Sequence, residues 1–348
     1  MTKTLSLKFI LLSAAAMLWF CMASACSGKS SDYRYLDGIV WNTSFHIVYC
    51  AESDLSDSIM MELNRVEQSV SVFKKGSVTD RVNAGNGVEV DSLFLKVYEE
   101  SRRINELSEG MFDPTISPIV NAWGFGKGHA PTADTLRIDS LLEMTGIRRT
   151  RIENMRLFKD DDRIQFNFSA IAKGYGCDRV GEMLRRNGVE NFLVEIGGEI
   201  MARGRNSQGD PWTVSIDSPS EDGNLNHTSV RIIDVYNQGL ATSGNYRNYH
   251  TSGNRRFGHT ISPVTGRPIQ TDVISATVLA PTAMQADAAA TACMALGSKK
   301  GIALCDSLDY RVLLILEDNS FVNNILFDGV TNTAAKIARK NNTSPMPE

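Results

Sequence analysis

Two side chains with hard oxygen atoms, Asp287 and Thr291, lie four residues apart in the alanine-rich stretch 281–297, PTAMQADAAATACMALG. If the stretch is helical, both oxygens lie on one face, and the surrounding alanines let a ligand or a neighbouring backbone come close. A lone carboxylate is costly to bury, and this pair of oxygens suits a hard cation such as Mg²⁺. The stretch alone leaves a second interpretation open, in which Asp287 bonds a neighbouring loop and Thr291 bonds its own helix.

The ends of this helix are marked in the sequence. Pro281 precedes it, Thr282 and Gln285 have the spacing of a capping box, and Gly297 stands where a C-terminal cap belongs. These signals predict that the whole stretch forms one helix.

Two further segments carry groups that suit a bound anion. Lys173, in FSAIAKGYGCD, falls in the first turn of a helix predicted over 170–186, where its ammonium and free N–H groups could hold a phosphate. An ordinary surface lysine is the alternative. Gly197 and Gly198 interrupt a hydrophobic strand pattern, which indicates either a bulge or a close approach of the backbone to a ligand.

A long polar connection is predicted between two strands, from Gly239 to Gln270. It contains Ser243 and Gly244, and its His259 precedes a Pro-to-Gly turn. Connections of this length are usually functional, and a loop histidine within reach of a substrate proton could act as a general base. The sequence contains no P-loop, GxSxG elbow, HExxH helix or dinucleotide-binding GxGxxG.

The remaining patterns predict a mixture of helices and hairpin-like strand pairs. An amphipathic helix is predicted over 55–73 from apolar residues at helical spacing, which are Ile59, Leu63, Val66, Val70 and Phe73. Other helices are predicted over 92–107 and 298–307, and strands or strand pairs at 38–50, 151–158 with 163–168, 191–217, 229–236, 273–279 and 310–327. Because helices and strand pairs do not alternate regularly, these elements predict an α+β fold with antiparallel sheets.

The N-terminal residues 1–25 have the pattern of a secretory signal, because Lys3 and Lys8 precede an apolar run and small residues lead to Cys26. A cysteine in this position is typical of a bacterial lipoprotein, in which Cys26 becomes lipidated; ordinary signal-peptidase cleavage is the alternative. Beyond the signal, a tether is expected over 26–37, a single domain over 38–330 and a flexible tail over 331–348.

Composition disfavours some classes of function. With 42% hydrophobic and 22% charged residues, the 348-residue chain has the composition of a soluble globular protein. Its formal net charge of −4 becomes about −6 without the two signal lysines, which disfavours a nucleic-acid binder. Cysteines outside the signal region show no zinc or disulfide spacing, and Cys177 and Cys293 are expected to be small buried residues.

Seven segments, in this order, resemble the ApbE family of FAD:protein FMN transferases: GMFDPTISPIVNAWGFG, FSAIAKGYGCD, VEIGGEIMARG, GDPWTVSID, ATSGNYR, GHTISPVTGRP and APTAMQADAAATACMALG. The resemblance extends from Trp41 to Leu314. It implies an α+β fold with a pseudo-duplicated, T-fold-like core of antiparallel sheets with packed helices, and FAD held between the two halves. It also implies Mg²⁺-dependent transfer of FMN from FAD to a threonine side chain of a target protein, with release of AMP.

The resemblance implies roles for individual residues. It assigns Asp287, Thr291 and the backbone carbonyl of Ala170 as Mg²⁺ ligands, and His259 as the base that acts on the incoming threonine. It places FAD next to the other matched residues, which are Trp41, Phe112, Asp113, Pro114, Asn167, Lys173, Gly197, Gly198, Ser243 and Gly244.

The resemblance also implies partners and a location. The partners are FAD and target proteins with an acceptor threonine, such as subunits of quinone reductases or Rnf-type electron-transfer complexes and other periplasmic flavoproteins. The location is the bacterial cell envelope, where the chain faces the periplasm and is held at the membrane by its lipid anchor only.

Three positions depart from the family pattern. Asn167 stands where many members have Asp, Ser262 stands where Asp is expected, and Trp41 and Asn42 replace Met and Gly. The first change removes a carboxylate close to the metal, and Trp41 could stack on the flavin ring. Two alternatives therefore stay open: a Mg²⁺-dependent FAD pyrophosphatase that gives FMN and AMP, and a non-catalytic FAD-binding lipoprotein.

Overall fold

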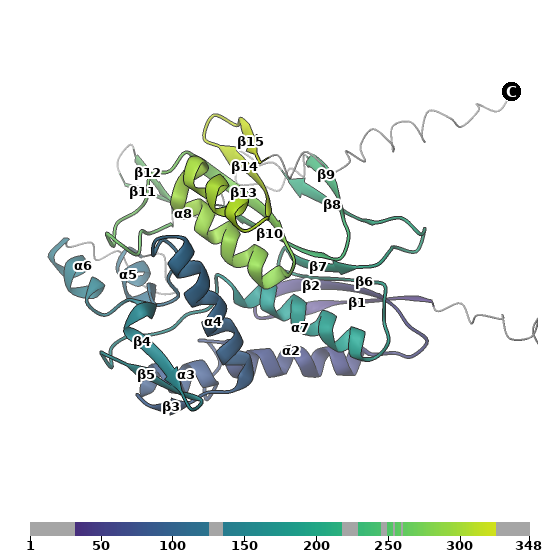
Figure 1. The fold of residues 1–348 in the computed structure, drawn as a ribbon, viewed down its shortest axis with the longest axis horizontal. Coiled ribbons are helices and arrows are strands. Elements are labelled where there is room, and N and C mark those ends of the chain that lie inside the picture. The colour runs from purple at the N-terminus through teal and green to yellow at the C-terminus, as the bar shows by residue number, and fades with distance from the viewer. Residues whose placement is uncertain are drawn as a thin grey trace, which may run out of the picture.

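The computed structural model describes residues 32–124, 135–217, 229–244, 249–252, 255–258 and 260–324, and within these ranges the fold is built on one eight-stranded sheet (Figure 1). Every neighbouring pair of strands is antiparallel, in the order β1-β2-β6-β7-β10-β13-β14-β15. The strands are β1 Tyr33–Val40, β2 Thr43–Cys50, β6 Phe192–Ile196, β7 Glu199–Arg203, β10 Gln238–Gly244, β13 Val273–Ala280, β14 Arg311–Leu316 and β15 Phe321–Asn323. The predicted α+β fold with antiparallel sheets is therefore confirmed.

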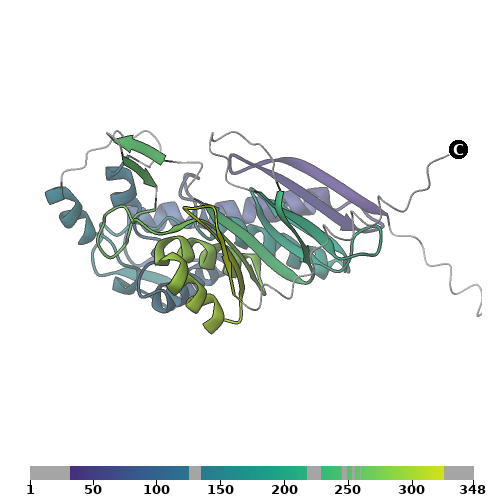
Figure 2. The ribbon, with the colours of Figure 1, turned by 90° about the horizontal axis from the view of Figure 1, so that it is seen from above.

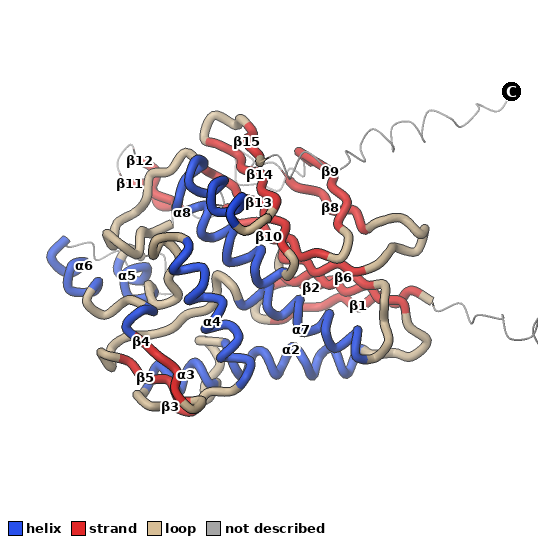
Figure 3. Tube along the Cα trace, in the orientation of Figure 1, coloured by secondary structure: helices blue, strands red, loops and turns tan. Residues whose placement is uncertain are grey.

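Helices cover one face of this sheet (Figures 1 and 3). The helices of the described chain are α2 Ser56–Val70, α3 Val78–Ala84, α4 Ser92–Leu107, α5 Ser117–Ala122, α6 Thr135–Leu142, α7 Ala172–Arg186 and α8 Ala283–Ser307, with a 3₁₀ turn at Ile147–Arg149. Helix α7 packs on β6 and β7, α8 packs on β10 and β13, and α2 and α4 pack in turn on α7 and α8.

A strand hairpin, β8 Trp212–Asp217 and β9 Ser229–Val235, covers the other face. The side chains of β6 alternate between the two faces of the sheet, and apolar side chains lie on both faces. Phe192, Val194 and Ile196 point toward the helices, whereas Leu193 packs against the cluster under the hairpin. Because successive strand residues face opposite sides, apolar side chains are buried on both sides of the sheet.

A smaller three-stranded sheet in the described chain has the order β3-β5-β4 and lies beside α3 and α4. Its strands are β3 Val88–Glu89, β4 Thr150–Glu153 and β5 Arg156–Lys159. Figure 2 shows α5, α6 and a separate hairpin, β11 Tyr249–Ser252 and β12 Arg255–Gly258, together at one end of the molecule. None of the helices in the described ranges is both long and apolar enough to cross a membrane.

The helices predicted over 55–73 and 92–107 are confirmed as α2 and α4, and most of the apolar residues named for the first are buried. Helix α4 has the predicted bounds, and α2 buries Ile59, Leu63, Val66 and Val70. The inclusion of Phe73 in this helix is wrong, because α2 ends at Val70 and Phe73 is 74% exposed.

The first strand pair is a hairpin, and it begins earlier than predicted. Strand β1 starts at Tyr33, within the segment expected to be a tether. Trp41 and Asn42 make the turn to β2 with left-handed backbones, at φ of 53° and 61°. Two consecutive residues with positive φ are typical of the tightest hairpin turns.

The predicted pairing of 151–158 with 163–168 is wrong. Strand β4 pairs instead with β5, across a turn at Asn154 and Met155 that also has positive φ. The segment 163–168 forms no strand, because the Asn83 side chain accepts from the Phe166 N–H at 2.7 Å and donates to the Phe166 carbonyl at 2.9 Å. A side-chain amide thus satisfies the backbone groups that a strand partner would have bound.

The predicted polar connection from Gly239 to Gln270 is also wrong in its first part. Strand β10 lies inside the main sheet between β7 and β13, and Leu240 and Ala241 are 2% and 0% exposed. Because most residues of β10 are small, the sequence pattern did not indicate a buried strand. A Cβ at Gly239 would lie 2.1 Å from the Ala283 nitrogen, so glycine is needed where β10 passes beneath the start of α8.

Helix α8 contains both helices predicted over 281–307. They meet at a kink at Gly297, whose φ of 77° is the left-handed conformation expected of a glycine cap. At the other end, Thr282 Oγ1 accepts from the Gln285 N–H at 3.2 Å. The Gln285 Oε1 atom is buried without a hydrogen-bond partner, so only half of the predicted capping box is formed.

Candidate functional site

Helices α7 and α8 come into contact at Gly174, near their N-terminal ends. The Gly174 N–H donates to Asp287 Oδ2 at 3.1 Å. A Cβ at position 174 would lie 2.3 Å from the Ala283 carbonyl oxygen and 2.9 Å from Asp287 Cβ. Glycine therefore lets the helices approach closely enough for a backbone N–H of α7 to hold the Asp287 carboxylate.

Oxygen atoms from three segments converge beside this carboxylate. Thr291 Oγ1, one turn along α8, donates to the Ala170 carbonyl oxygen at 3.5 Å and lies 3.3 Å from Ser243 Oγ on β10. Carboxylate, hydroxyl and carbonyl oxygens are the protein ligands that Mg²⁺ takes, so this donor set fits that cation. Among the described residues, no group of three or more His, Cys, Asp and Glu side chains could hold a metal ion.

Burial makes the Asp287 charge costly in the absence of a cation. The residue is 3% exposed, and burial raises the pKa of its carboxyl, although Lys173 and the Gly174 N–H act in the opposite direction. A buried carboxylate with a raised pKa is common at functional sites. The structural alternative, in which Asp287 bonds only a neighbouring segment, leaves this cost unexplained.

Glu199, at the start of β7, is a member of this cluster that the sequence patterns did not single out. It forms an ion pair with Lys173 and is 3% exposed. Burial, followed by the Asp287 charge, raises the pKa of its carboxyl. Burial lowers the pKa of Lys173, but the charges of Asp287 and Glu199 outweigh it and raise that pKa. The segment VEIGGEIMA held a signal for this residue, since Glu199 is a charged residue directly before the apolar run 200–202.

Gly197 and Gly198 form the two-residue turn between β6 and β7, with φ of 62° and 101°. The predicted bulge is wrong, because Ile196 and Glu199 are directly paired across the turn. A Cβ at Gly197 would lie 2.8 Å from Thr43 Oγ1 and 3.2 Å from Lys173 Cδ. Gly197 therefore makes room for the Lys173 stem.

Asp178, on α7, caps the N-terminus of α8. Its carboxylate accepts from the N–H groups of Ala283 at 2.8 Å and Met284 at 2.9 Å, which are among the donors that a helix leaves unpaired. Burial raises the pKa of Asp178 from its ordinary value of 3.8 to about 7, although both backbone bonds lower it.

This shift predicts a pH-dependent stability for the metal-free protein. Between pH 3.8 and about 7 the folded state binds the Asp178 proton and the unfolded state does not, so the free energy of unfolding falls as pH rises. Above about pH 7 both states are ionised, and the contribution is constant. Denaturant titrations of wild type and Asp178→Asn should diverge by up to about 1.4 kcal/mol per pH unit in this window. Parallel curves would show that Asp178 stays ionised throughout.

A cavity of about 170 Å³ opens beside Lys173. Its lining residues come from the β1–β2 turn, the end of α2 and the turn before α7: Trp41, Val66, Glu67, Val70, Ser71, Val72, Phe73, Asn167, Ser169, Ala172 and Lys173. Two aromatic side chains and the aliphatic residues make it largely apolar, while Lys173 supplies a cation. Such a combination suits a planar ring with an anionic substituent.

Trp41 and Phe73 reach this cavity for different reasons. Trp41 stands on the β1–β2 turn, and a Cβ at Gly176 would lie 2.5 Å from its ring, so the small residue of α7 makes room for the indole. The Trp41 Nε1 atom is buried without a hydrogen-bond partner. Phe73 follows the end of α2, and its exposure reflects a position at the cavity wall rather than in the core. An aromatic residue just after a helix, next to two lysines, was the signal that could have identified it.

Asn167 joins two of the predicted segments. Its N–H donates to the Pro114 carbonyl at 2.7 Å, and its Oδ1 accepts from the Ser169 N–H at 3.0 Å. The Asp113 carboxylate is already used locally, accepting from Thr115 and from the Ile147 N–H at 3.1 Å. Phe112 is 2% exposed in the core. The segment 112–114 thus lies against the Asn167 turn, but the Phe112 and Asp113 side chains serve the fold.

The remaining predicted residues lie at the end of β10 and beyond it. Gly244 is the last residue of β10, next to Ser243. Ser262 Oγ accepts from the Val264 and Thr265 N–H groups at 3.3 and 3.1 Å, a turn-capping role that an Asp could also fill. His259 lies outside the described residues.

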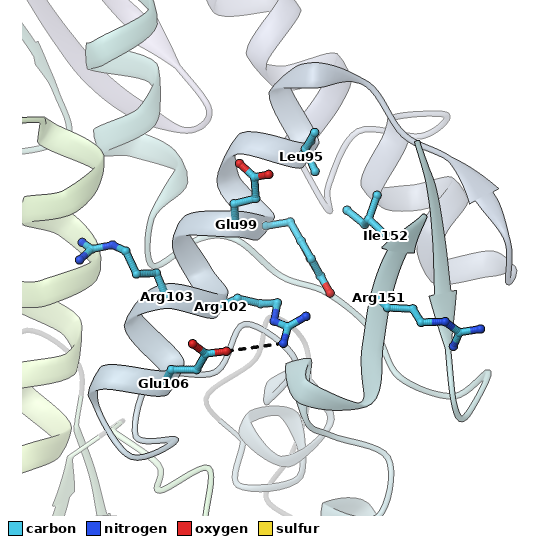
Figure 4. A pocket seen from close by; sticks show the side chains of 8 residues that line it. Leu95, Glu99, Arg102, Arg103, Glu106, Arg151 and Ile152 are labelled. Carbon is cyan, nitrogen blue, oxygen red and sulfur yellow. Dashed lines mark ion pairs between the residues drawn. The ribbon is translucent and has the colours of Figure 1, made fainter. Parts of the chain in front are cut away.

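A second hollow, of about 380 Å³, lies between α4 and β4 and does not join this site (Figure 4). The arginine side chains that line this hollow already form ion pairs with glutamates. Arg102 lies 3.5 Å from Glu106, and Arg151 lies 2.8 Å from Glu153. Figure 4 shows Arg103 pointing to the opposite side of α4 from Ile152, where it bonds Glu100 and the Tyr310 hydroxyl.

Comparison with known proteins supplies the family. A family model described as the ApbE family matches residues 41–315. The chain is 36% identical over 307 residues to the FAD:protein FMN transferase of Vibrio cholerae, which covers 84% of this chain and 90% of that protein. It is 34% identical over 330 residues to the FAD:protein FMN transferase of Haemophilus influenzae, with coverage of 90% and 95%.

Solved structures agree with the sequence comparison. The flavin transferase ApbE from Vibrio cholerae superimposes with a TM-score of 0.77 at 34% identity, covering 86% of this chain and 99% of that chain. The flavinyl transferase ApbE from Pseudomonas stutzeri, in its apo form, also gives a TM-score of 0.77, at 28% identity and with coverage of 85% and 96%.

Proposed function

Because this chain belongs to the ApbE family, we propose that it is an FAD:protein FMN transferase, which moves FMN from FAD to a threonine hydroxyl of a target protein and releases AMP. The observation that supports this chemistry best is a set of hard oxygens from Asp287, Thr291 and Ala170 close to a lysine at the end of an aromatic-walled cavity. A flavin dinucleotide combines the two groups that such a site accommodates, a flat aromatic ring and a pyrophosphate.

The proposed chemistry is a phosphoryl transfer. The threonine oxygen forms a bond to the phosphorus of the FMN half, the bond from that phosphorus to the bridging oxygen breaks, and AMP leaves with the bridging oxygen. Mg²⁺, held by Asp287, Thr291 and the Ala170 carbonyl, would supply positive charge to the pyrophosphate. The Lys173 ammonium binds a phosphate oxygen, and Trp41 and Phe73, which line the cavity, flank the flavin ring.

His259 is proposed to take the threonine proton. A threonine hydroxyl has a very high pKa, so its attack on phosphorus needs a base within hydrogen-bond reach. The assignment is supported by the GHTISPVTGRP segment, where the turn that Ser262 caps directs the chain immediately after His259.

The wider proposals follow from the N-terminal segment and the family. We propose a lipoprotein anchored through Cys26, facing the periplasm, with targets of the quinone reductase or Rnf-type electron-transfer kind. Residues 1–31 lie outside the described part of the chain, and the support is their signal-like sequence. The proposed core is pseudo-duplicated and T-fold-like, and the support for this is family membership.

The function is tested by incubating the purified protein with FAD, Mg²⁺ and a target domain that carries an acceptor threonine. We expect the mass of FMN to be added to the target and AMP to appear in equal amount. Free FMN and AMP without a modified target would identify the pyrophosphatase alternative. Retained FAD with no AMP, even at saturating Mg²⁺, would identify a non-catalytic flavin-binding lipoprotein.

The aromatic walls give a separate prediction for substrate binding. Trp41→Ala and Phe73→Ala should each weaken FAD binding about tenfold, because a lost aromatic contact is worth roughly 1.4 kcal/mol. Flavin fluorescence quenching measures this affinity. Phe321→Ala is a matched control, since Phe321 is also an exposed aromatic but lies on β15. Unchanged affinity in both cavity variants would place the flavin ring elsewhere.

A further inference from the structure

The β6–β7 hairpin holds Lys173 at two points. Gly197, in the turn, leaves space for the lysine stem, because a Cβ there would lie 3.2 Å from Lys173 Cδ. Glu199, two residues later, forms an ion pair with the ammonium. Lys173 is the only ion-pair partner of Glu199 in the described chain, and the Glu199 side chain is 4% exposed. One short segment therefore fixes both the stem and the charged end of this lysine.

Lys173 also lies close to a second buried carboxylate. It directly precedes Gly174, whose N–H donates to Asp287 Oδ2 at 3.1 Å, yet no ion pair within 4.0 Å joins Lys173 and Asp287 in the described chain. Both carboxylates are almost fully buried, and a buried charge gains most from a close opposite charge. Without Glu199, Asp287 would be the buried carboxylate that remains beside this part of α7.

An ion pair between Lys173 and Asp287 would compete with a cation for the same oxygens. Within the described part of the chain, the Gly174 N–H is the one hydrogen-bond donor to the Asp287 carboxylate, at Oδ2, and this leaves acceptor capacity on the carboxylate. A lysine ammonium placed there would use that capacity and add a repulsive positive charge. The Lys173–Glu199 pair avoids this arrangement.

We propose that Glu199 is a positioning residue, which holds the Lys173 ammonium at the β6–β7 turn and thereby keeps the Asp287 carboxylate open to a divalent cation. This inference deepens the proposed function and rests on its assignment of Asp287 as a metal ligand. It explains why a buried glutamate stands directly after the two turn glycines.

The test is a calorimetric titration of the purified protein with Mn²⁺ alone, in the absence of FAD, which measures the Mn²⁺ affinity. Mn²⁺ accepts the same oxygen ligands as Mg²⁺. Glu199→Gln should weaken Mn²⁺ binding about tenfold, the size expected when a residue just outside the ligand set of a metal site is lost. The double variant Lys173→Met with Glu199→Gln should return to wild-type affinity, because the competing ammonium is gone. Glu199→Asp, which keeps the charge with a shorter reach, should fall between wild type and Glu199→Gln.

Glu62→Gln is the matched control. Glu62 is also 4% exposed and paired with a cation of α7, Arg179 at 2.8 Å, but it belongs to α2. It should leave the Mn²⁺ affinity unchanged. In transfer assays, Glu199→Gln should regain activity as Mg²⁺ is raised, which a folding defect would not produce.

A crystal structure of metal-free Glu199→Gln separates repositioning of the lysine from a simple loss of charge. We expect Lys173 Nζ to move to within hydrogen-bond distance of Asp287. If it stays at the turn, or if the Mn²⁺ affinity is unchanged, the inference is overturned. Failure of the proposed function would appear differently, as an absence of flavin transfer by the wild-type protein, since the Mn²⁺ series needs no FAD.

Discussion

Asp287→Asn is expected to lower flavin transfer by about a thousandfold at any practical Mg²⁺ concentration, because a bound metal ion stabilises a phosphoryl-transfer transition state by several kcal/mol. The substitution keeps the shape of the side chain, and the new amide oxygen can still accept from the Gly174 N–H. What it removes is the negative charge that burial makes costly.

The same substitution should make the metal-free protein more stable. Burial raises the pKa of Asp287, so ionising this carboxyl in the folded state costs free energy that a neutral amide does not. Thermal unfolding without metal should therefore shift upward in Asp287→Asn, and added Mg²⁺ should stabilise wild type but not the variant. Opposite effects on stability and activity are typical of residues kept for function.

Asp91→Asn is the control for both measurements. The Asp91 carboxylate likewise accepts a backbone N–H, from Phe94 at 2.8 Å, and a hydroxyl, from Ser69 at 2.6 Å, but it caps α4. It should keep full transfer activity. Full activity in Asp287→Asn would remove Asp287 from the metal site.

The elements that position the site could be predicted from local sequence signals. Helix α4 has the predicted bounds, and the Gly297 cap and the Asp287 and Thr291 spacing in α8 were readable because caps and helical periodicity depend only on neighbours in the chain. The place of Ala170 beside Thr291 was implied only by resemblance to the family, and the contact of Ser243 with Thr291 was not predicted, since no local pattern brings three distant segments together.

The features that were missed depend on long-range partners. Segment 163–168 has the composition of a strand, but Asn83, more than 80 residues earlier, takes its backbone bonds. Strand β10 lacked the large apolar residues that mark buried strands, because α8 packs closely on it. Glu199 has the charge of a surface residue, and only the half-buried Lys173 paired with it explains its position. In each case the residue that determines the local structure is distant in the sequence, so a pattern of neighbouring residues cannot indicate it.

Gly174→Ala is expected to separate α7 from α8 and to damage both stability and activity. The added Cβ would lie 2.3 Å from the Ala283 oxygen and 2.6 Å from its carbonyl carbon, which are backbone atoms that cannot rotate away. Helix α8 must therefore shift, at a cost of about 2 to 3 kcal/mol for overpacking. The shift carries Asp287 away from the Gly174 N–H and from the Ala170 carbonyl, and a displacement of about 1 Å at a reacting site can cost roughly a hundredfold in rate.

Gly181→Ala tests whether position, rather than the loss of any helical glycine, causes this effect. Gly181 also lies in α7, but its added Cβ would meet the Phe192 ring at 3.0 Å, and a side chain can give way. We expect a loss of about 1 kcal/mol in stability and no change in Mn²⁺ affinity or transfer. Chemical denaturation and Mn²⁺ calorimetry on both variants make the comparison. If Gly174→Ala bound Mn²⁺ as wild type does, the close approach of α7 to α8 would be a matter of packing alone, and the metal site would tolerate a wider gap between the helices.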